Sequence, residues 1–260
     1  MKYFVIDAFA EKVFQGNPAG VCILEKPLKQ RIMQNIAKEN NLSETAFVYK
    51  EKEQYFLKWF TPISEIDLCG HATMAAAYVI MNFIEKMTSV VTFHTKSGIL
   101  IVEKKGNLFE MDLPCYMPEK IDVIEKVTDV IGIKPVETYI SRDLIILLEN
   151  ENQVKNIKPD FDKMEKLNIG LGVVVTAKGK EVDFVSRYFT PELENKEDAV
   201  TGSSHSSLIP FWAKRLQKND MVAKQISERG GILYCKNKGQ RVKVSGTAVL
   251  YMMGEINIEY

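Results

Sequence analysis

The chain has 260 residues, of which 46% are hydrophobic, so it is long enough to bury a sizeable core as one large domain or two smaller ones. Its 34 basic side chains equal its 34 acidic ones, which argues against a polyanionic nucleic acid or an acidic membrane surface as partner. The N-terminus meets Asp7 too early for a signal sequence and no long apolar run follows, so we expect a cytoplasmic protein. Cys22, Cys69, Cys115 and Cys235 are scattered without a C-x-x-C pair, which predicts neither a zinc site nor a disulfide framework.

The first residues predict a hairpin-like opening followed by a helix. Residues 2–9 and 21–24 read as strands, and the turn between them has the sequence Gly-Asn-Pro-Ala-Gly. Asn17 lies in this turn, where it is either an ordinary turn former or a ligand contact. Apolar residues at helical spacing predict a helix over 29–39.

The next strand, over residues 42–48, carries one acid in an apolar setting. Glu44 is either a solvent-facing acid on an alternating strand or a carboxylate whose pKa is raised by its buried neighbours. A carboxylate that transfers protons near neutral pH needs such a raised pKa. Both interpretations of Glu44 stay open at this point.

A Phe-Thr-Pro turn at 60–62 leads through an acidic loop to Cys69, Gly70 and His71. From His71 to about Met87 the apolar residues predict a buried helix. Gly70 permits close backbone approach at the start of that helix, where unpaired N–H groups and the helix dipole favour a substrate carboxylate. His71 is one of only three histidines and is either a group that titrates near neutrality or a structural residue.

The strands and helices predicted for the rest of the chain follow an order similar to that of the elements before them. Strands are predicted at 90–93, 98–103, 108–113, 139–140, 144–148, 172–176, 183–189, 231–236, 241–246 and 249–258. Helices are predicted at 120–131 and at 204–217, where Pro210 interrupts or tightens the helix. The connection between 148 and 172 is rich in Asn and Lys and is expected to be irregular.

Three ordered landmarks recur at nearly the same spacing. The Phe-Thr-Pro turn at 60–62 recurs 129 residues later, Gly70 corresponds to Gly202 after 132, and the Gly-Ile-Leu run at 98–100 recurs after 133. We infer an internal duplication with an N-terminal half over 1–116 and a C-terminal half over 117–260, whose last strand is free to pack back on the first half.

The second copy carries a motif that is recognisable as a whole. Its sequence, Glu-Asp-Ala-Val-Thr-Gly-Ser-Ser-His over 197–205, resembles the E-D-P-V-T-G-S-A-H signature of the phenazine-biosynthesis PhzF-like isomerase family. Further matches are Gly-Asn-Pro at 16–18, Leu-Ser-Glu-Thr-Ala-Phe at 42–47, Phe-Thr-Pro at 60–62, Cys-Gly-His-Ala-Thr at 69–73, Arg-Val at 241–242 and Gly-Thr-Ala-Val at 246–249. Ala199 and Ser204 depart from the usual Pro and Ala, which changes backbone rigidity and polarity beside the site.

The resemblance implies a diaminopimelate-epimerase-like α+β fold. Two similar halves would each wrap a curved, β-barrel-like sheet around a central helix, with the active site in the cleft between them. The family implies an isomerase without cofactor or metal, usually a homodimer, acting on a small-molecule carboxylate. By position the catalytic residues fall on Glu44, His71, Asp198 and Ser203. Substrate contacts fall on Asn17, Gly70, Ala72, Thr201, Gly202 and Ser204.

Three functional hypotheses follow. The leading one is an isomerase in which Glu44 moves a proton between carbons, while His71, Asp198 and Ser203 hold polar groups of the substrate. The second is a racemase or epimerase with two opposed bases; Cys69 stands where one thiol would, but the repeat places Thr201 at the other, and a hydroxyl is too weak an acid. Cys69 is then interpreted as a small buried residue. The third hypothesis is a catalytically silent binding protein.

Overall fold

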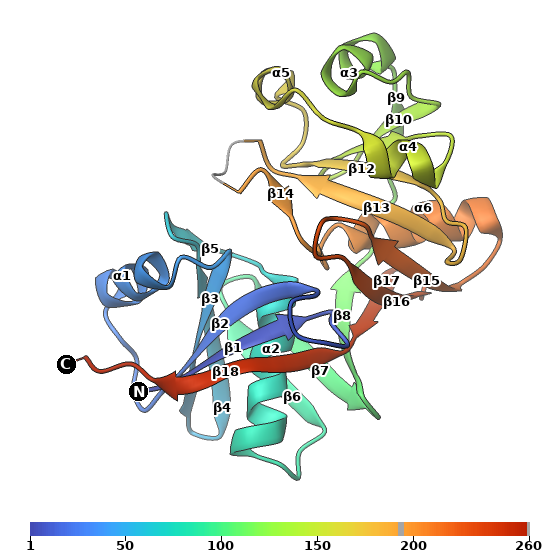
Figure 1. Cartoon of the computed structure of the whole chain (residues 1–260). Helices are drawn as coiled ribbons and strands as arrows, with labels where there is room; N and C mark the ends of the chain where they lie inside the picture. Colours follow the sequence, from blue (N-terminus) through green and yellow to red (C-terminus); the bar gives the residue numbers. More distant parts are fainter. Residues whose placement is uncertain (192–194, 259–260) are drawn as a thin grey trace. The chain divides into compact units, whose positions relative to one another are not determined.

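The computed structural model describes residues 1–191 and 195–258, and the chain forms two compact units (Figure 1). Unit 1 comprises Met1–Asp112 and Ser245–Tyr260, and unit 2 comprises Leu113–Val244. The division predicted from the sequence was at 116/117, with the last strand of the second half free to pack back on the first. The C-terminal segment belongs to unit 1 because its strand, β18 (Ala248–Glu255), pairs antiparallel with β1 (Lys2–Ala8).

Unit 1 is a strand-rich body that encloses a buried helix. Its other strands are β2 (Asn17–Leu24), β3 (Glu44–Glu51), β4 (Gln54–Phe60), β5 (Glu65–Ile66), β6 (Val90–Thr95), β7 (Gly98–Lys105) and most of β8 (Leu108–Pro114). Its helices are α1 (Gln30–Asn40), α2 (Gly70–Val79) and the π-helical turn η1 (Ile80–Ile84). Small side chains fill most of α2, so strands β1, β2, β3, β7 and β18 pack against it and bury it on all sides.

Unit 2 repeats this construction. Its strands are β9 (Glu119–Ile121), β10 (Glu137–Ile140), β11 (Leu144–Leu147), β12 (Val173–Lys178), β13 (Phe184–Phe189), β14 (Glu197–Asp198), β15 (Asp220–Gln225), β16 (Gly231–Asn237) and most of β17 (Arg241–Gly246). Its helices are α3 (Ile124–Ile131), α4 (Glu151–Asn156), α5 (Phe161–Leu167) and α6 (His205–Leu216). The buried helix is α6, whose residues from His205 to Ala213 are all buried.

Strand pairing shows the internal duplication directly. In unit 1, β1/β2 is antiparallel, β2/β3 parallel, β3/β4 and β4/β5 antiparallel, β4/β6 parallel and β6/β7 antiparallel. In unit 2, β10/β11, β11/β12, β12/β13, β13/β14, β13/β15 and β15/β16 repeat the same directions in the same order. The expected fold of two similar α+β halves is therefore confirmed.

Pro210 lies inside α6 without breaking it. A proline lacks the N–H that would bind the carbonyl four residues earlier, here that of Ser206. The backbone N–H of Tyr116 donates to this carbonyl at 2.9 Å and replaces the missing bond. Of the two predicted effects of Pro210, interruption or tightening of the helix, interruption is therefore absent.

Three other helical expectations need correction. The α-helical part of the first buried helix ends at Val79, and the π-helical turn η1 follows it directly. In this turn the Asn82 amide donates to the Tyr78 carbonyl at 2.8 Å. The helix expected over 120–131 begins only at Ile124, because residues 119–121 pair with β10 as strand β9. The connection expected to be irregular contains α4 and α5.

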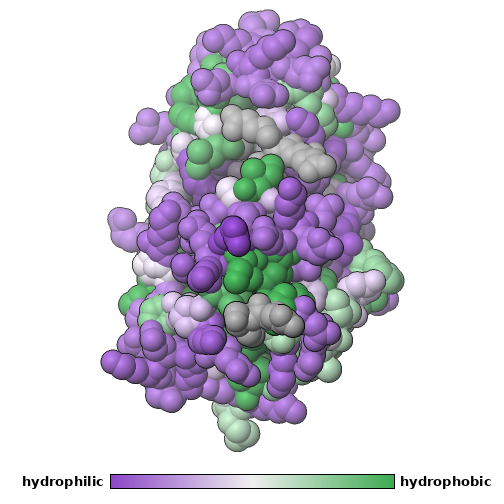
Figure 2. All heavy atoms as spheres, turned by 90° about the vertical axis from the view of Figure 1, so that its left-hand side faces the viewer, coloured by the Kyte–Doolittle hydropathy of each residue, from purple (hydrophilic) through white to green (hydrophobic). Residues whose placement is uncertain are grey.

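Polar side chains cover most of the face of the molecule seen in Figure 2, and hydrophobic residues appear there only in small groups. Each unit buries a core of its own. One core cluster includes Met33, Phe47 and Phe60, and another includes Val127, Ile146 and Phe189. No helix in the described part of the chain is both long and apolar enough to cross a bilayer.

Candidate functional site

Four polar residues of unit 1 meet at the N-terminus of α2. Glu44 opens β3, Asn17 opens β2, and Cys69 and His71 flank the first residue of the helix. Glu44 Oε2 lies 3.0 Å from His71 Nε2, and Asn17 Nδ2 lies 3.1 Å from His71 Nδ1. The Cys69 Sγ atom is 3.5 Å from the same Nδ1. The imidazole is thus contacted by a carboxylate on one side and by an amide and a thiol on the other.

Backbone geometry brings these residues together. Strands β2 and β3 run parallel and pair Ala19 with Glu44, so Asn17 and Glu44 lie close together where the two strands begin. Gly16 has φ +65°, and a Cβ there would lie 2.1 Å from the Ala8 carbonyl oxygen. Only glycine fits this turn, which delivers Asn17 to the start of β2.

The histidine and the thiol have shifted proton affinities. Burial by itself would lower the pKa of His71, but the adjacent Cys69 sulfur and the Glu44 carboxylate together raise it well above its usual value. Burial first, and then the Glu44 charge, raises the pKa of Cys69. The close packing of the three side chains therefore favours the imidazolium form of His71 and the protonated form of Cys69.

The N-terminus of α2 also presents backbone donors. The first helical hydrogen bond runs from the Thr73 N–H to the Cys69 carbonyl at 3.2 Å. The N–H groups of Gly70 and His71 precede this bond at the start of the helix, and that of Ala72 donates to the Cys69 sulfur. Together with the helix dipole, they favour a carboxylate at this position.

In unit 2, the corresponding loop is organised by a glutamine that the sequence analysis missed. Gln225 is fully buried at the end of β15; its Oε1 accepts from the Thr201 N–H at 2.9 Å and its Nε2 donates to the Asp198 carbonyl at 2.7 Å. The Thr201 hydroxyl donates to Asp198 Oδ2 at 2.5 Å. These bonds fix Asp198 and Thr201 side by side.

Gly202 lies three residues before α6 and does not begin the helix itself. The turn from 202 to 204 is tightened by i→i+3 bonds, from the N–H groups of His205 and Ser206 to the carbonyls of Gly202 and Ser203. This 3₁₀-like turn leads into α6, which begins one residue after the predicted start at 204. Ser204 is buried, and its hydroxyl donates to the Thr201 carbonyl at 2.9 Å. The hydroxyl that departs from the family motif is therefore bound within the loop.

Ser203 lies beside an arginine that the sequence analysis also missed. Arg142 Nη2 is 3.5 Å from the Ser203 hydroxyl, and Arg142 Nε is 4.0 Å from Oδ1 of the buried Asp143. The Tyr188 hydroxyl donates to the same Oδ1 at 3.0 Å. A signal was present in the sequence, because the polar triplet at 141–143 separates two apolar strands.

The predicted site residues therefore fall into two groups, one in each unit. Asn17, Glu44, Gly70, His71 and Ala72 gather in unit 1. Asp198, Thr201, Gly202, Ser203 and Ser204 gather in unit 2. Cys69 is buried as expected, but it contacts His71 and belongs to the first group.

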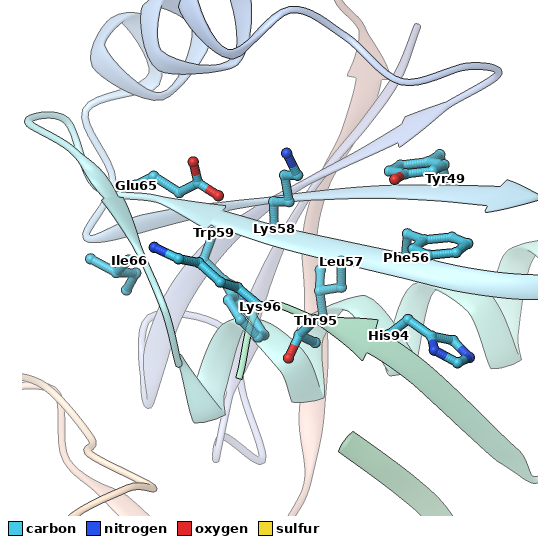
Figure 3. Close-up of a pocket in the computed structure, with 10 residues that line it drawn as sticks. All are labelled: Tyr49, Phe56, Leu57, Lys58, Trp59, Glu65, Ile66, His94, Thr95 and Lys96. Atoms are coloured by element: carbon cyan, nitrogen blue, oxygen red, sulfur yellow. The ribbon is translucent and has the colours of Figure 1, made fainter. Parts of the chain in front are cut away.

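A separate hollow on unit 1 contains none of these residues (Figure 3). It opens where β4 changes partner, from β6 at Tyr55 and Phe56 to β5 at Trp59 and Phe60. Figure 3 shows the Phe56 ring between the Tyr49 and His94 rings, and the Tyr49 and Phe56 rings stack with centroids 5.0 Å apart.

Known proteins resemble the chain over nearly its whole length. The model of the phenazine biosynthesis-like protein family, PhzC-PhzF, matches residues 6–254. An uncharacterized isomerase of Pseudomonas aeruginosa is 43% identical over 255 residues, which cover 98% of each chain. A PhzF-family phenazine biosynthesis protein of Enterococcus faecalis is 49% identical, with a TM-score of 0.97 over 99% of each chain.

A more distant structure shares only the fold. A hydroxyproline epimerase of Agrobacterium vitis superposes with a TM-score of 0.64 over 98% of this chain and 91% of its own, at 8% identity. With the family motifs, the duplicated strand pairing and the near-complete match to the family model, the chain belongs to the phenazine biosynthesis-like (PhzC-PhzF) family.

Proposed function

We propose that this protein is a cofactor-independent isomerase that moves a proton between two carbons of a small carboxylated substrate. The observation that carries the proposal is the contact between the Glu44 carboxylate and the buried His71 imidazole, beside the N-terminus of α2. This places a base next to backbone donors that suit a carboxylate. The isomerase named among the relatives supports the reaction class.

In the proposed reaction, Glu44 is first the base and then the acid. Its carboxylate takes a proton from one substrate carbon, and the electron pair left behind delocalises toward the substrate's own carboxylate. The resulting carboxylic acid exchanges its proton with solvent and delivers a proton to a second carbon, where the electron pair comes to lie. The raised pKa of His71 favours the imidazolium form, which places a positive charge 3.0 Å from the oxygen that takes up the proton.

The helix N-terminus is proposed to hold the substrate while the proton moves. The N–H groups at Gly70 and His71 would bind the substrate carboxylate and stabilise the charge that it gains in the transition state. Ala72, whose N–H donates to the Cys69 sulfur, would contact the substrate from the same turn. Asn17 would keep the His71 ring in place through its amide, which lies 3.1 Å from Nδ1 and accepts from the protonated nitrogen when its oxygen is turned toward it.

The second group of residues is proposed to bind other polar parts of the substrate. Asp198 and Ser203 would make these contacts, with Thr201, Gly202 and Ser204 shaping the loop. Arg142 would keep the Ser203 hydroxyl oriented, because its guanidinium lies 3.5 Å from that oxygen. Support for this part comes from the internal repeat and from the family motif over 197–205.

A two-base racemase has less support. Thr201, the repeat counterpart of Cys69, donates its hydroxyl to Asp198 and cannot serve as a second base. The raised pKa of Cys69 also keeps that thiol protonated at neutral pH.

From the family resemblance we further propose a cytoplasmic homodimer that works without metal. Light scattering on the purified protein tests the dimer.

The test is a screen followed by isotope exchange. Small cyclic and amino-acid carboxylates are screened by thermal shift, and each compound that stabilises the protein is incubated with it in deuterium oxide. We expect deuterium at a carbon of at least one ligand. A ligand that stabilises the protein without exchange at any carbon would instead identify a silent binding protein.

A further inference from the structure

We propose that Glu44, Cys69 and His71 form a binding site for one thiophilic divalent cation of the Zn²⁺ class. In each residue one ligand atom is available, and the three atoms lie within 4.8 Å of one another. Carboxylate oxygen, thiolate sulfur and imidazole nitrogen are the ligand types that zinc takes in proteins. The scattered cysteines did not predict a zinc site, because the other two ligands come from elements that only the fold brings together.

The distances are close to those of a tetrahedral site. Bond lengths of about 2.0–2.3 Å place neighbouring ligand atoms about 3.3–3.6 Å apart in such a site. Glu44 Oε2 is 3.0 Å from His71 Nε2, and Cys69 Sγ is 4.0 Å from the same nitrogen. A cation would therefore need the carboxylate to move away slightly and the thiol to rotate inward about its Cα–Cβ bond.

The contact between Glu44 and His71 is also one that a cation could replace. Among the described residues, the buried Oε2 of Glu44 accepts no hydrogen bond of normal geometry, although it is only 3.0 Å from a ring nitrogen. The carboxylate oxygen thus lies off the line along which the ring N–H bond points. A cation in place of the imidazole proton would bind both atoms without that restriction.

Asn17 completes the site as the hydrogen-bond partner of Nδ1, the imidazole nitrogen that would not bind the cation. When Nε2 binds a cation, the proton stays on Nδ1 and needs an acceptor, and metal-bound histidines usually donate this proton to such a partner. Asn17 lies 3.1 Å from Nδ1, and a half-turn of its amide presents the oxygen. The side chain of Glu44 is 16% exposed, which leaves a path for the ion from solvent.

Cation binding would affect the reaction, and this consequence alone depends on the proposed function. A bound cation occupies both the Glu44 carboxylate and His71, so it blocks the proposed base. The site is then inhibitory, and an enzyme that works without metal would be inactivated by zinc and restored by a chelator. Because the Cys69 thiol must lose its proton to bind, the affinity should increase with pH.

The binding test uses Co²⁺, whose bond to a thiolate gives a near-ultraviolet charge-transfer band. Chelator-treated protein is titrated with Co²⁺, and Zn²⁺ is then added to displace it. We expect a band that saturates at one ion per chain, strengthens as pH rises and disappears on adding Zn²⁺. Cys69→Ser should abolish the band, whereas Cys115→Ser, which removes the partly exposed thiol, should keep it.

Asn17→Ala should bind Co²⁺ about 10–100-fold more weakly, as is typical when a partner behind a metal-bound histidine is lost. Circular dichroism and thermal melts show that each variant is folded, and Cys69→Ala serves if Cys69→Ser is not. A band that persists in both Cys69 variants, or no saturable binding, would overturn the site. Stoichiometric Co²⁺ binding with undiminished exchange would leave the site standing and would refute the proposed role of Glu44.

Discussion

Replacing Glu44 by Gln tests the proposed reaction most directly. The amide has nearly the same shape as the carboxylate, so it keeps the packing at the start of β3, but it cannot carry a proton back and forth. A general acid–base group contributes about 10²–10⁴-fold in rate, which corresponds to about 3–5 kcal/mol of transition-state stabilisation. We expect that loss in solvent-deuterium incorporation, with ligand affinity nearly unchanged.

The matched control is Glu51→Gln, which neutralises the exposed acid at the other end of the same strand. It should exchange deuterium at the parent rate. Equal rates for Glu44→Gln and the parent would move the base to His71 or Asp198 and would refute the mechanism with one carboxylate.

The same substitution has a second readout that needs no substrate. Glu44 helps to raise the pKa of His71 in the folded state. The stabilisation from a raised histidine pKa is fully present below the unfolded value, about 6.5, and is lost as pH rises through the folded value. Glu44→Gln should therefore destabilise the protein more at pH 6 than at alkaline pH, as measured by urea unfolding. A destabilisation that does not change with pH would contradict the assigned ion pair.

The remaining predictions concern both groups of residues. His71→Asn and Asp198→Asn should each weaken ligand binding and exchange together, as isothermal titration and the deuterium assay can show; a loss of rate alone would argue against a positioning role. Exhaustive chelation should leave exchange intact, and a loss that one added metal restores would show a metal-dependent enzyme. Gln225→Leu should lower the free energy of unfolding by about 1–3 kcal/mol, since it leaves the buried Thr201 N–H without its acceptor; unchanged stability in urea would show that water or another group replaces it. Burial lowers the pKa of His205 to about 4, so stability should fall by roughly 3 kcal/mol as pH drops from 6.5 to 4, and NMR should detect no protonation of this ring at pH 6.

The sequence predicted the repeat and the first group of site residues because both depend on local signals. Phe-Thr-Pro and Gly-Ile-Leu mark strand ends, and their spacing carries over directly into the repeated strand pairing. Glu44 and His71 were predicted by motif, while their 3.0 Å contact depends on the packing of α2 against β3 and could not be read from spacing.

Other features were missed because their causes are not local. Strand β9 replaces the start of a predicted helix because β10 offers it backbone partners. Pro210 is tolerated because Tyr116, 94 positions earlier, supplies a donor to the Ser206 carbonyl. Helices α4 and α5 did have a local signal, since Asn150 and Asp160 each cap a helix with the side-chain oxygen.

Gln225 and Arg142 show the same limit within the site. Neither lies in the recognised motif, yet the glutamine binds the Thr201 N–H 24 positions away and the arginine contacts Ser203 from 61 positions away. Such partners become visible only when the strands that carry them are placed.

The pairing of β18 with β1 affects how the protein is made. It closes a chain loop of about 240 residues, whereas unit 2 is one continuous segment that needs nothing from after Val244. During synthesis, unit 2 is therefore complete before unit 1 is. Until β18 emerges, β1 is bonded only to β2 and offers an open strand edge to any neighbouring chain. Deletion of β18 should accordingly favour aggregation, and a nascent chain stalled before residue 248 should bind chaperones that recognise such edges.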